Sequence, residues 1–162
     1  FENCKFKYGG TASGDYDVIK KAIDMVSTDR LFNKVAIRPG APVVVSIREE
    51  GQLLIGLSGN PAGATVAMLL LIFSLIARLA GTKKQLECIQ GKLTKPLLRK
   101  GGLRGFLWAN YCQEKVHVYV TPFENQFCGA IKTHTKSNCL IEIPAGKVNI
   151  AAGDFVTIWK LP

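Results

Sequence analysis

Two glycine-containing loops carry the residues best suited to bind a charged ligand. The first includes Gly9, Gly10, Ser13 and Gly14, and the second is the run Ser58-Gly59-Asn60-Pro61. Each loop follows a strand-like run and opens a helix-like run. The N-terminus of a helix presents unpaired N–H groups and the positive end of its dipole, and glycine lets the backbone approach a ligand closely. Both loops therefore predict positions where an anion can bind.

Charged side chains beside these loops extend the same chemistry. Asp15 and Asp17 directly follow the first loop, and carboxylate oxygens are ligands that Mg²⁺ prefers. Lys34 and Arg38 flank a strand-like run and could neutralise an anion. Phosphate together with magnesium is the chemistry that this combination suits.

Each of these features also has a purely structural explanation. Glycine is the usual residue of a tight turn, and acidic residues in the first turn of a helix complement its dipole. An Asn-Pro pair is a common helix start, because Asn is a strong N-cap and Pro suits the first helical position. Lys34 and Arg38 can equally be solvated surface charges. The residue types alone leave both explanations open.

Helix-like and strand-like patterns alternate in the first half of the chain. Apolar residues recur at helical spacing over 15–26, and a long apolar run follows Pro61 to about residue 79. Turn residues separate three strand-like runs, 35–38, 42–47 and 53–57. We therefore expect an α/β domain over residues 1–82. Lys5 and Lys7 suit a strand with one exposed face, so this domain reads as the back half of a larger one.

The second half contains short alternating runs separated by turn residues. These runs cover 88–93, 105–111, 116–120, 138–143 and 155–159. Their length and spacing are typical of an all-β sandwich or barrel. The predicted fold class is therefore α/β followed by β, with a small C-terminal β-barrel over residues 83–162.

The composition is typical of a globular protein, and the second half of the chain is basic. Hydrophobic residues make up 48% of the 162 residues and charged residues 20%, and the net charge is +9. Residues 1–82 hold nine Lys/Arg and seven Asp/Glu, while residues 83–162 hold twelve and five. A basic surface attracts anions of several kinds. We expect no nucleic-acid partner, because the basic strands lack the interleaved aromatic residues on which bases stack.

The cysteines and the apolar runs indicate in which compartment the protein works. Five scattered cysteines form no CxxC pair, which argues against a structural zinc site or a disulfide framework and favours a reducing cytosol. The longest apolar run, 66–77, is short for a bilayer and fits a buried core helix, so we expect no membrane partner. No signal peptide opens the chain.

Four motifs in order resemble the molybdopterin molybdotransferase family (MoeA and the gephyrin E-domain). They are GGxxxGDYD from Gly9, KVAIRPGxP from Lys34, GLSGNP from Gly56, and a barrel tail containing KGGLRGFL, NCLIEIPAG and AGDFV. The resemblance covers essentially the whole chain. It implies the back half of a MogA-like three-layer α/β domain, followed by the family's C-terminal barrel.

The resemblance also implies a reaction and roles for the residues above. Members insert molybdate into adenylylated molybdopterin and release AMP in a Mg²⁺-dependent step, in a cleft assembled by a homodimer. By this similarity Asp17, Lys34 and Arg38 would be catalytic, and Asp17 would also bind the metal. The other residues would bind substrate: Gly9, Gly10, Ser13, Gly14, Asp15, Ser58, Gly59, Asn60 and Pro61.

The sequence departs from the family pattern at five positions. Ala12, Ala41, Ser58, Trp108 and Cys128 stand where the family has serine, lysine, proline, arginine and serine. We expect the chain to be part of a larger enzyme that cannot complete the reaction alone. The alternative is a non-catalytic molybdopterin-binding or scaffold module.

Overall fold

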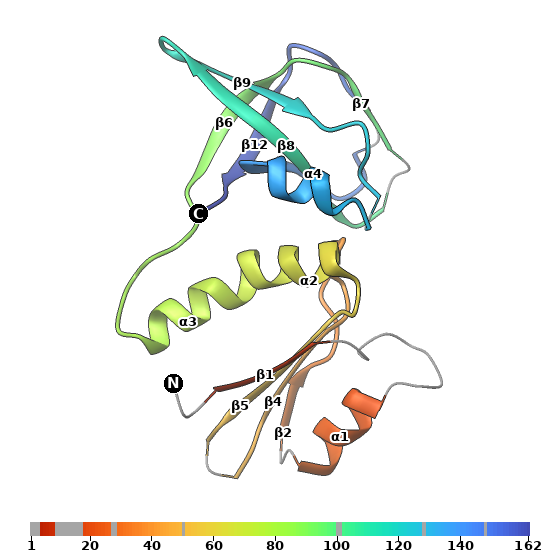
Figure 1. Cartoon of the computed structure of the whole chain (residues 1–162), viewed down its shortest axis with the longest axis vertical. Coiled ribbons are helices and arrows are strands. Elements are labelled where there is room, and N and C mark those ends of the chain that lie inside the picture. The colour runs from red at the N-terminus through yellow and green to blue at the C-terminus, as the bar shows by residue number, and fades with distance from the viewer. Residues whose placement is uncertain are drawn as a thin grey trace. The chain divides into compact units, whose positions relative to one another are not determined.

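The chain forms two compact units, residues 1–85 and 86–162, and each contains a β-sheet (Figure 1). The computed structural model describes residues 4–8, 18–26, 29–49, 51–99, 102–127, 129–147 and 149–162. For residues 4–8 and 18–20 it describes the backbone alone. The two units are described separately below.

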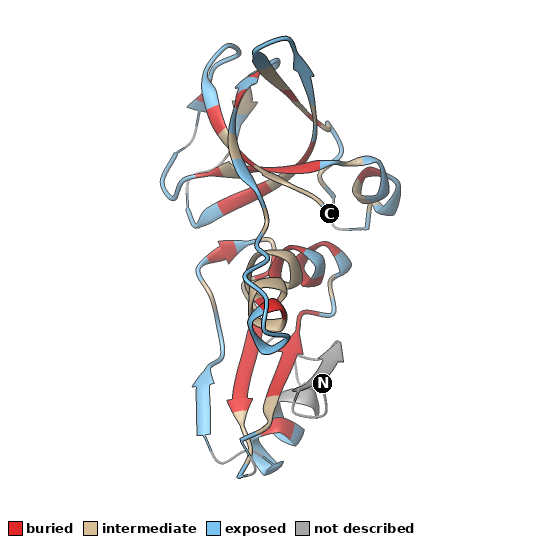
Figure 2. Ribbon diagram, turned by 90° about the vertical axis from the view of Figure 1, so that its left-hand side faces the viewer, coloured by how far each residue is buried: buried red, intermediate tan, exposed pale blue. Residues whose placement is uncertain are grey.

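A four-stranded sheet forms the centre of the first unit. Its strands lie in the order β1-β5-β4-β2, with β1 parallel to β5 and the other neighbours antiparallel. Their bounds are β1 (Cys4–Tyr8), β2 (Asp29–Phe32), β4 (Val43–Ile47) and β5 (Leu53–Leu57). Figure 2 shows that the two central strands, β4 and β5, are almost wholly buried.

Helices cover both faces of this sheet because successive strand side chains point to opposite sides. On one face, Ile23 of α1 (Val18–Val26) packs against Val44 and Leu54. On the other face lies one long helix, composed of α2 (Pro61–Ala67), the π-helical turn η1 (Met68–Ile72) and α3 (Phe73–Leu79). Its buried contacts form a single cluster of Val43, Val45, Ile55, Leu57, Ala64, Ala67 and Ile72. The expected three-layer α/β arrangement is confirmed.

The long helix has the length and composition of a membrane span. Pro61–Leu79 is a 19-residue helix with a mean hydropathy of 2.1. Buried core helices share these properties, and Ala64, Ala67 and Ile72 of this helix lie in the apolar cluster against the sheet. In the described structure 39% of this window is buried, and its buried part packs as a core helix does.

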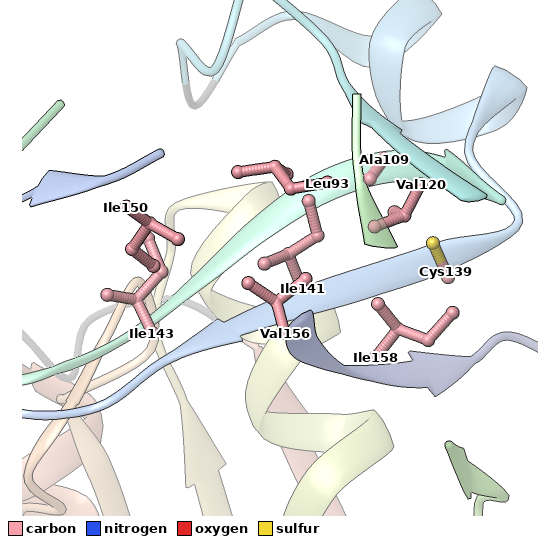
Figure 3. Close-up of a cluster of buried hydrophobic side chains, with 9 residues drawn as sticks. All are labelled: Leu93, Ala109, Val120, Cys139, Ile141, Ile143, Ile150, Val156 and Ile158. Carbon is pink, nitrogen blue, oxygen red and sulfur yellow. The ribbon is translucent and has the colours of Figure 1, made fainter. Parts of the chain in front are cut away.

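Five strands of the second unit close into a barrel. They follow one another in the order β10-β12-β6-β9-β8, and pairing of β10 with β8 completes the ring. Their bounds are β6 (Cys88–Leu93), β8 (Arg104–Glu114), β9 (His117–Pro122), β10 (Cys139–Ile143) and β12 (Phe155–Lys160). The interior contains the side chains drawn in Figure 3: Leu93, Ala109, Val120, Cys139, Ile141, Ile143, Ile150, Val156 and Ile158. The expected C-terminal barrel is confirmed.

Some elements differ from the sequence prediction. The strand expected over 35–38 is reduced to β3 (Ile37–Arg38), because the Val35 amide donates to Ala41 and the chain turns back there. Four short elements were not predicted: β2, β7 (Leu97–Leu98), α4 (Ile131–Lys136) and β11 (Asn149–Ile150). Strands β7 and β11 have only two residues each, and β2 and α4 have almost no buried residue, so periodicity does not reveal them.

The barrel has its own closed core, so we expect residues 86–162 to fold when expressed alone. Cooperative unfolding in urea would confirm this, and a segment without a transition would contradict it. Ile141→Ala should lower the free energy of unfolding by about 2–5 kcal/mol, because it leaves a cavity in the core. Val116→Ala provides the control, since Val116 is 84% exposed and its truncation should change little.

Candidate functional site

The described part of the chain holds six of the residues expected at the site. Lys34, Arg38 and the run 58–61 are described, whereas Gly9, Gly10, Ser13, Gly14, Asp15 and Asp17 lie outside the described residues. The first glycine loop is therefore untested by the structure. The second loop, residues 58–61, is described in full.

Asn60 caps the first turn of α2. Its backbone is extended, with φ −78° and ψ 118°, and its Oδ1 accepts from the Ala62 amide at 3.1 Å and the Gly63 amide at 3.4 Å. The Asn60 amide itself donates to the Ser58 hydroxyl at 3.2 Å, and Ser58 is buried. This is the capping arrangement that Asn favours, with Pro61 at the first helical position.

The cap changes how an anion can bind at this helix. Pro61 has no N–H, Asn60 occupies the next two amides, and the Ala64 amide donates to the Asn60 carbonyl at 2.9 Å. The backbone donors that the sequence analysis assigned to an anion are thus used within the loop. The Asn60 Nδ2 amide has no acceptor among the described residues, so it remains available as a side-chain donor, and the dipole keeps its positive end here.

Two unpaired cations lie on the segment that leads into β4. Lys34 and Arg38 are both exposed, and neither side chain has an ion-pair partner within the described residues. The backbone between them is folded by hydrogen bonds from the Val35 amide to the Ala41 carbonyl and from the Ile37 amide to the Val35 carbonyl. The same segment reaches the first turn of α2 at Gly40, which lies against Gly63. The segment that carries both cations thus contacts the capped turn of α2 at Gly40.

The barrel contains a polar network that sequence reasoning missed. The Arg104 guanidinium donates to both carboxylate oxygens of Glu142 at 2.7 and 2.8 Å, and the Trp159 indole N–H donates to Oε2 at 2.7 Å. Burial raises the pKa of Glu142, but these hydrogen bonds and the Arg104 charge outweigh it and lower the pKa. Both oxygens are occupied, so the network stabilises the barrel surface and offers no open ligand position.

The described part of the chain shows neither an activated thiol nor a metal-binding cluster. Burial raises the pKa of the Cys139 thiol to about 12, so it stays protonated and unreactive near neutral pH. Burial also raises the pKa of Cys88. No group of three or more His, Cys, Asp or Glu side chains in the described ranges could hold a metal ion.

Trp108 occupies an apolar environment. Its side chain is 3% exposed and stacks on His134 of α4, with ring centroids 4.5 Å apart. Burial lowers the pKa of His134, which favours the neutral ring. A neutral aromatic pair thus stands at the position where the resembled family has an arginine.

The geometry defines a protein of two units: a three-layer α/β unit, in which a segment with two exposed cations contacts a capped helix, and a closed β-barrel. Two family models match the sequence: the probable molybdopterin binding domain over residues 6–102 and the MoeA C-terminal region (domain IV) over residues 90–161. The chain therefore belongs to the MoeA family and represents a C-terminal portion of it.

Relatives and solved structures agree with this assignment. Molybdopterin molybdenumtransferase from Staphylococcus aureus strain Mu50 is 28% identical over 151 residues, which cover 93% of this chain and 36% of the relative. The enzyme of the same name from Staphylococcus epidermidis gives the same identity and coverage. The chain thus spans about a third of the length of these relatives.

The similarity in structure extends to archaeal proteins. A molybdopterin biosynthesis MoeA protein from Pyrococcus horikoshii matches with a TM-score of 0.76 at 20% identity, covering 96% of this chain and 36% of that one. A molybdenum cofactor biosynthesis protein from Pyrococcus furiosus matches with a TM-score of 0.69, covering 90% of this chain and 54% of that one. At this identity the likeness shows the fold.

The cap predicts that the stability of an Asn60 variant depends on whether its side chain can still accept hydrogen bonds from the helix amides. Asn60→Ala should lower the free energy of unfolding by about 0.5–2 kcal/mol, because two amides lose their acceptor. Asn60→Asp should retain stability, since a carboxylate accepts the same bonds and suits the dipole. Urea denaturation of the whole chain measures both. Equal stability of the two variants would show that the cap contributes little.

The Glu142 network predicts a loss of stability in acid. Because the folded pKa of Glu142 lies below its ordinary value of 4.5, the ionised carboxylate stabilises the fold above that value. This contribution is lost as the pH falls through the folded pKa. Glu142→Gln should be less stable at pH 7 and should lose less further stability between pH 5 and 3. Parallel unfolding curves for the two proteins over this range would contradict the assignment.

Proposed function

We propose that this chain is the C-terminal part of a molybdopterin molybdenumtransferase of molybdenum cofactor biosynthesis. The reaction inserts molybdate into adenylylated molybdopterin and releases AMP. The names of the relatives and the two family models support this proposal. Because the chain covers 36% of those relatives, the complete catalytic unit needs further residues. We therefore expect no turnover by this polypeptide alone, and a homodimer as the working assembly in the cytoplasm.

The free cations of the first unit are the observation that carries the proposal. Lys34 and Arg38 are exposed and have no ion-pair partner among the described residues, and their segment packs against the first turn of α2. Arg38 lies on a segment that contacts this turn at Gly40. A guanidinium attracts phosphate or molybdate and can bind their oxygens through two parallel hydrogen bonds, and the positive end of a helix dipole favours the same anions. Asn60 Nδ2 would add a neutral donor. These side chains would bind and orient the anion.

Residues of the first glycine loop would complete the site. Gly9, Gly10 and Gly14 would let the backbone approach the substrate phosphate, with Ser13 and Asp15 beside it. Asp17 supplies a carboxylate oxygen of the kind that Mg²⁺ prefers. This carboxylate would hold Mg²⁺, whose charge would offset that of the phosphate, while Lys34 and Arg38 would hold the anion from the segment that precedes β4.

A second function, a non-catalytic molybdopterin-binding module, is favoured by one observation. Trp108 is buried against a neutral histidine, so this position supplies no charge to an anion. Ala41 likewise supplies no cation. A module of this kind would retain binding of the nucleotide and lose binding of free molybdate, which makes the two functions separable.

Titration of the whole chain with AMP in the presence of Mg²⁺ tests the proposal. We expect saturable binding, and we expect Arg38→Ala to weaken it by roughly ten- to a hundredfold, as loss of a charged hydrogen bond predicts. Isothermal titration calorimetry at fixed ionic strength measures the affinities. A parallel titration with molybdate distinguishes the transferase from the binding module.

Arg48→Ala is the matched control for Arg38→Ala. Arg48 follows β4, whereas Arg38 precedes it, so both variants remove one positive charge from opposite ends of the same strand. The control should bind AMP with unchanged affinity. Equal weakening by both variants would mean that net charge alone attracts the nucleotide, and absence of binding to the unmodified chain would overturn the proposed site.

A further inference from the structure

Gly40 makes a contact that no other residue type could make. It is buried, with φ +102°, a conformation that L side chains rarely adopt. A Cβ atom at this position would lie 2.7 Å from the Gly63 carbonyl oxygen and 3.5 Å from the Ala67 Cβ. Real Cβ atoms essentially never approach another atom as closely as 2.7 Å. Any side chain here would therefore push the segment away from α2.

The contact is reciprocal and joins backbone to backbone. A Cβ on Gly63 would lie 3.1 Å from the Gly40 nitrogen and 3.4 Å from its Cα. Gly63 occupies the first turn of α2, where its amide already donates to Asn60. The absence of side chains on both partners thus lets the segment before β4 rest directly on the capped turn of the helix.

Further interactions hold the same segment closed. The Val35 amide donates to the Ala41 carbonyl at 2.9 Å, which closes a loop around Arg38. Ile37 is 8% exposed, and its Cδ1 lies 3.4 Å from the place where a Gly40 side chain would begin. Arg38 follows Ile37 and precedes Gly40 by two residues, so its backbone is fixed on both sides while its side chain remains exposed.

We propose that Gly40 is a positioning residue for Arg38. It touches no ligand, and it acts by seating the Arg38 loop on the first turn of α2, beside Asn60. This inference rests on the proposed function, because Arg38 must bind the substrate anion for its position to matter. It adds that the affinity for the anion depends on a glycine whose own atoms are buried.

The test combines Gly40→Ala with Gly51→Ala as its control. Gly51 also has a positive φ, +73°, but a Cβ there would meet nothing within 4 Å. Gly40→Ala should weaken AMP binding about tenfold, a loss similar in order to that of one charged hydrogen bond, and Gly51→Ala should not. Hydrogen exchange at the Val35 amide should accelerate in Gly40→Ala alone, because its acceptor on Ala41 moves.

Gly63→Ala provides a milder variant that retains folding, since alanine favours helices and its Cβ needs only a small shift of Gly40.

A double-mutant cycle with Arg38→Ala separates positioning from a general effect on the fold. If Gly40 acts through Arg38, Gly40→Ala should cause little further loss of AMP affinity once Arg38 is absent. A full additional loss in that background would overturn the inference, as would unchanged affinity in both Gly40→Ala and Gly63→Ala. If Arg38→Ala weakens binding and the glycine variants do not, the positioning role fails and the proposed function stands. If the unmodified chain binds no AMP, the proposed function fails first.

Discussion

The junction between β5 and α2 is the local structure on which the first unit depends. Strand β5 is buried on both faces, so the chain must leave it in a loop that satisfies its own backbone groups. Asn60 does this by accepting two helix amides, and its own amide donates to the buried Ser58 hydroxyl. The helix that starts here supplies one whole layer of the unit. The cap at Asn60 therefore fixes the direction of a mostly apolar helix of 19 residues.

Both units contain ion pairs, and in the first unit Arg30 pairs with Asp24. In the barrel, Arg104, Lys95 and Lys160 each pair with a glutamate, and the Arg104–Glu142 pair gains a further donor from Trp159. In the first unit, Lys34 and Arg38 have no such partner among the described side chains. Paired charges mainly support the fold, whereas unpaired charges attract ligands from solution. The proposed anion site uses such unpaired cations of the first unit, although the barrel carries the larger net charge.

Sequence periodicity predicted the long elements correctly and the short ones poorly. Strands β4 and β5 and the helix from Pro61 were expected almost residue by residue, because their apolar patterns extend over five or more positions. Strand β2 has no buried residue and α4 has only one, so neither carries a pattern. The π-helical turn η1 was also missed, because its Met-Leu-Leu-Leu-Ile sequence suits an ordinary helix equally well.

The sequence by itself determined the fold class and the family, because both depend on local patterns: alternating strands, a capped apolar helix and motifs in a fixed order. It also identified Lys34 and Arg38 as candidate ligand-binding cations. Tertiary structure alone decided that the α2 amides are already used, that Gly40 rests on Gly63, and that Glu142 meets Arg104 across 38 residues. Such contacts join segments that the chain brings together only when its apolar faces pack, so spacing along the sequence does not encode them.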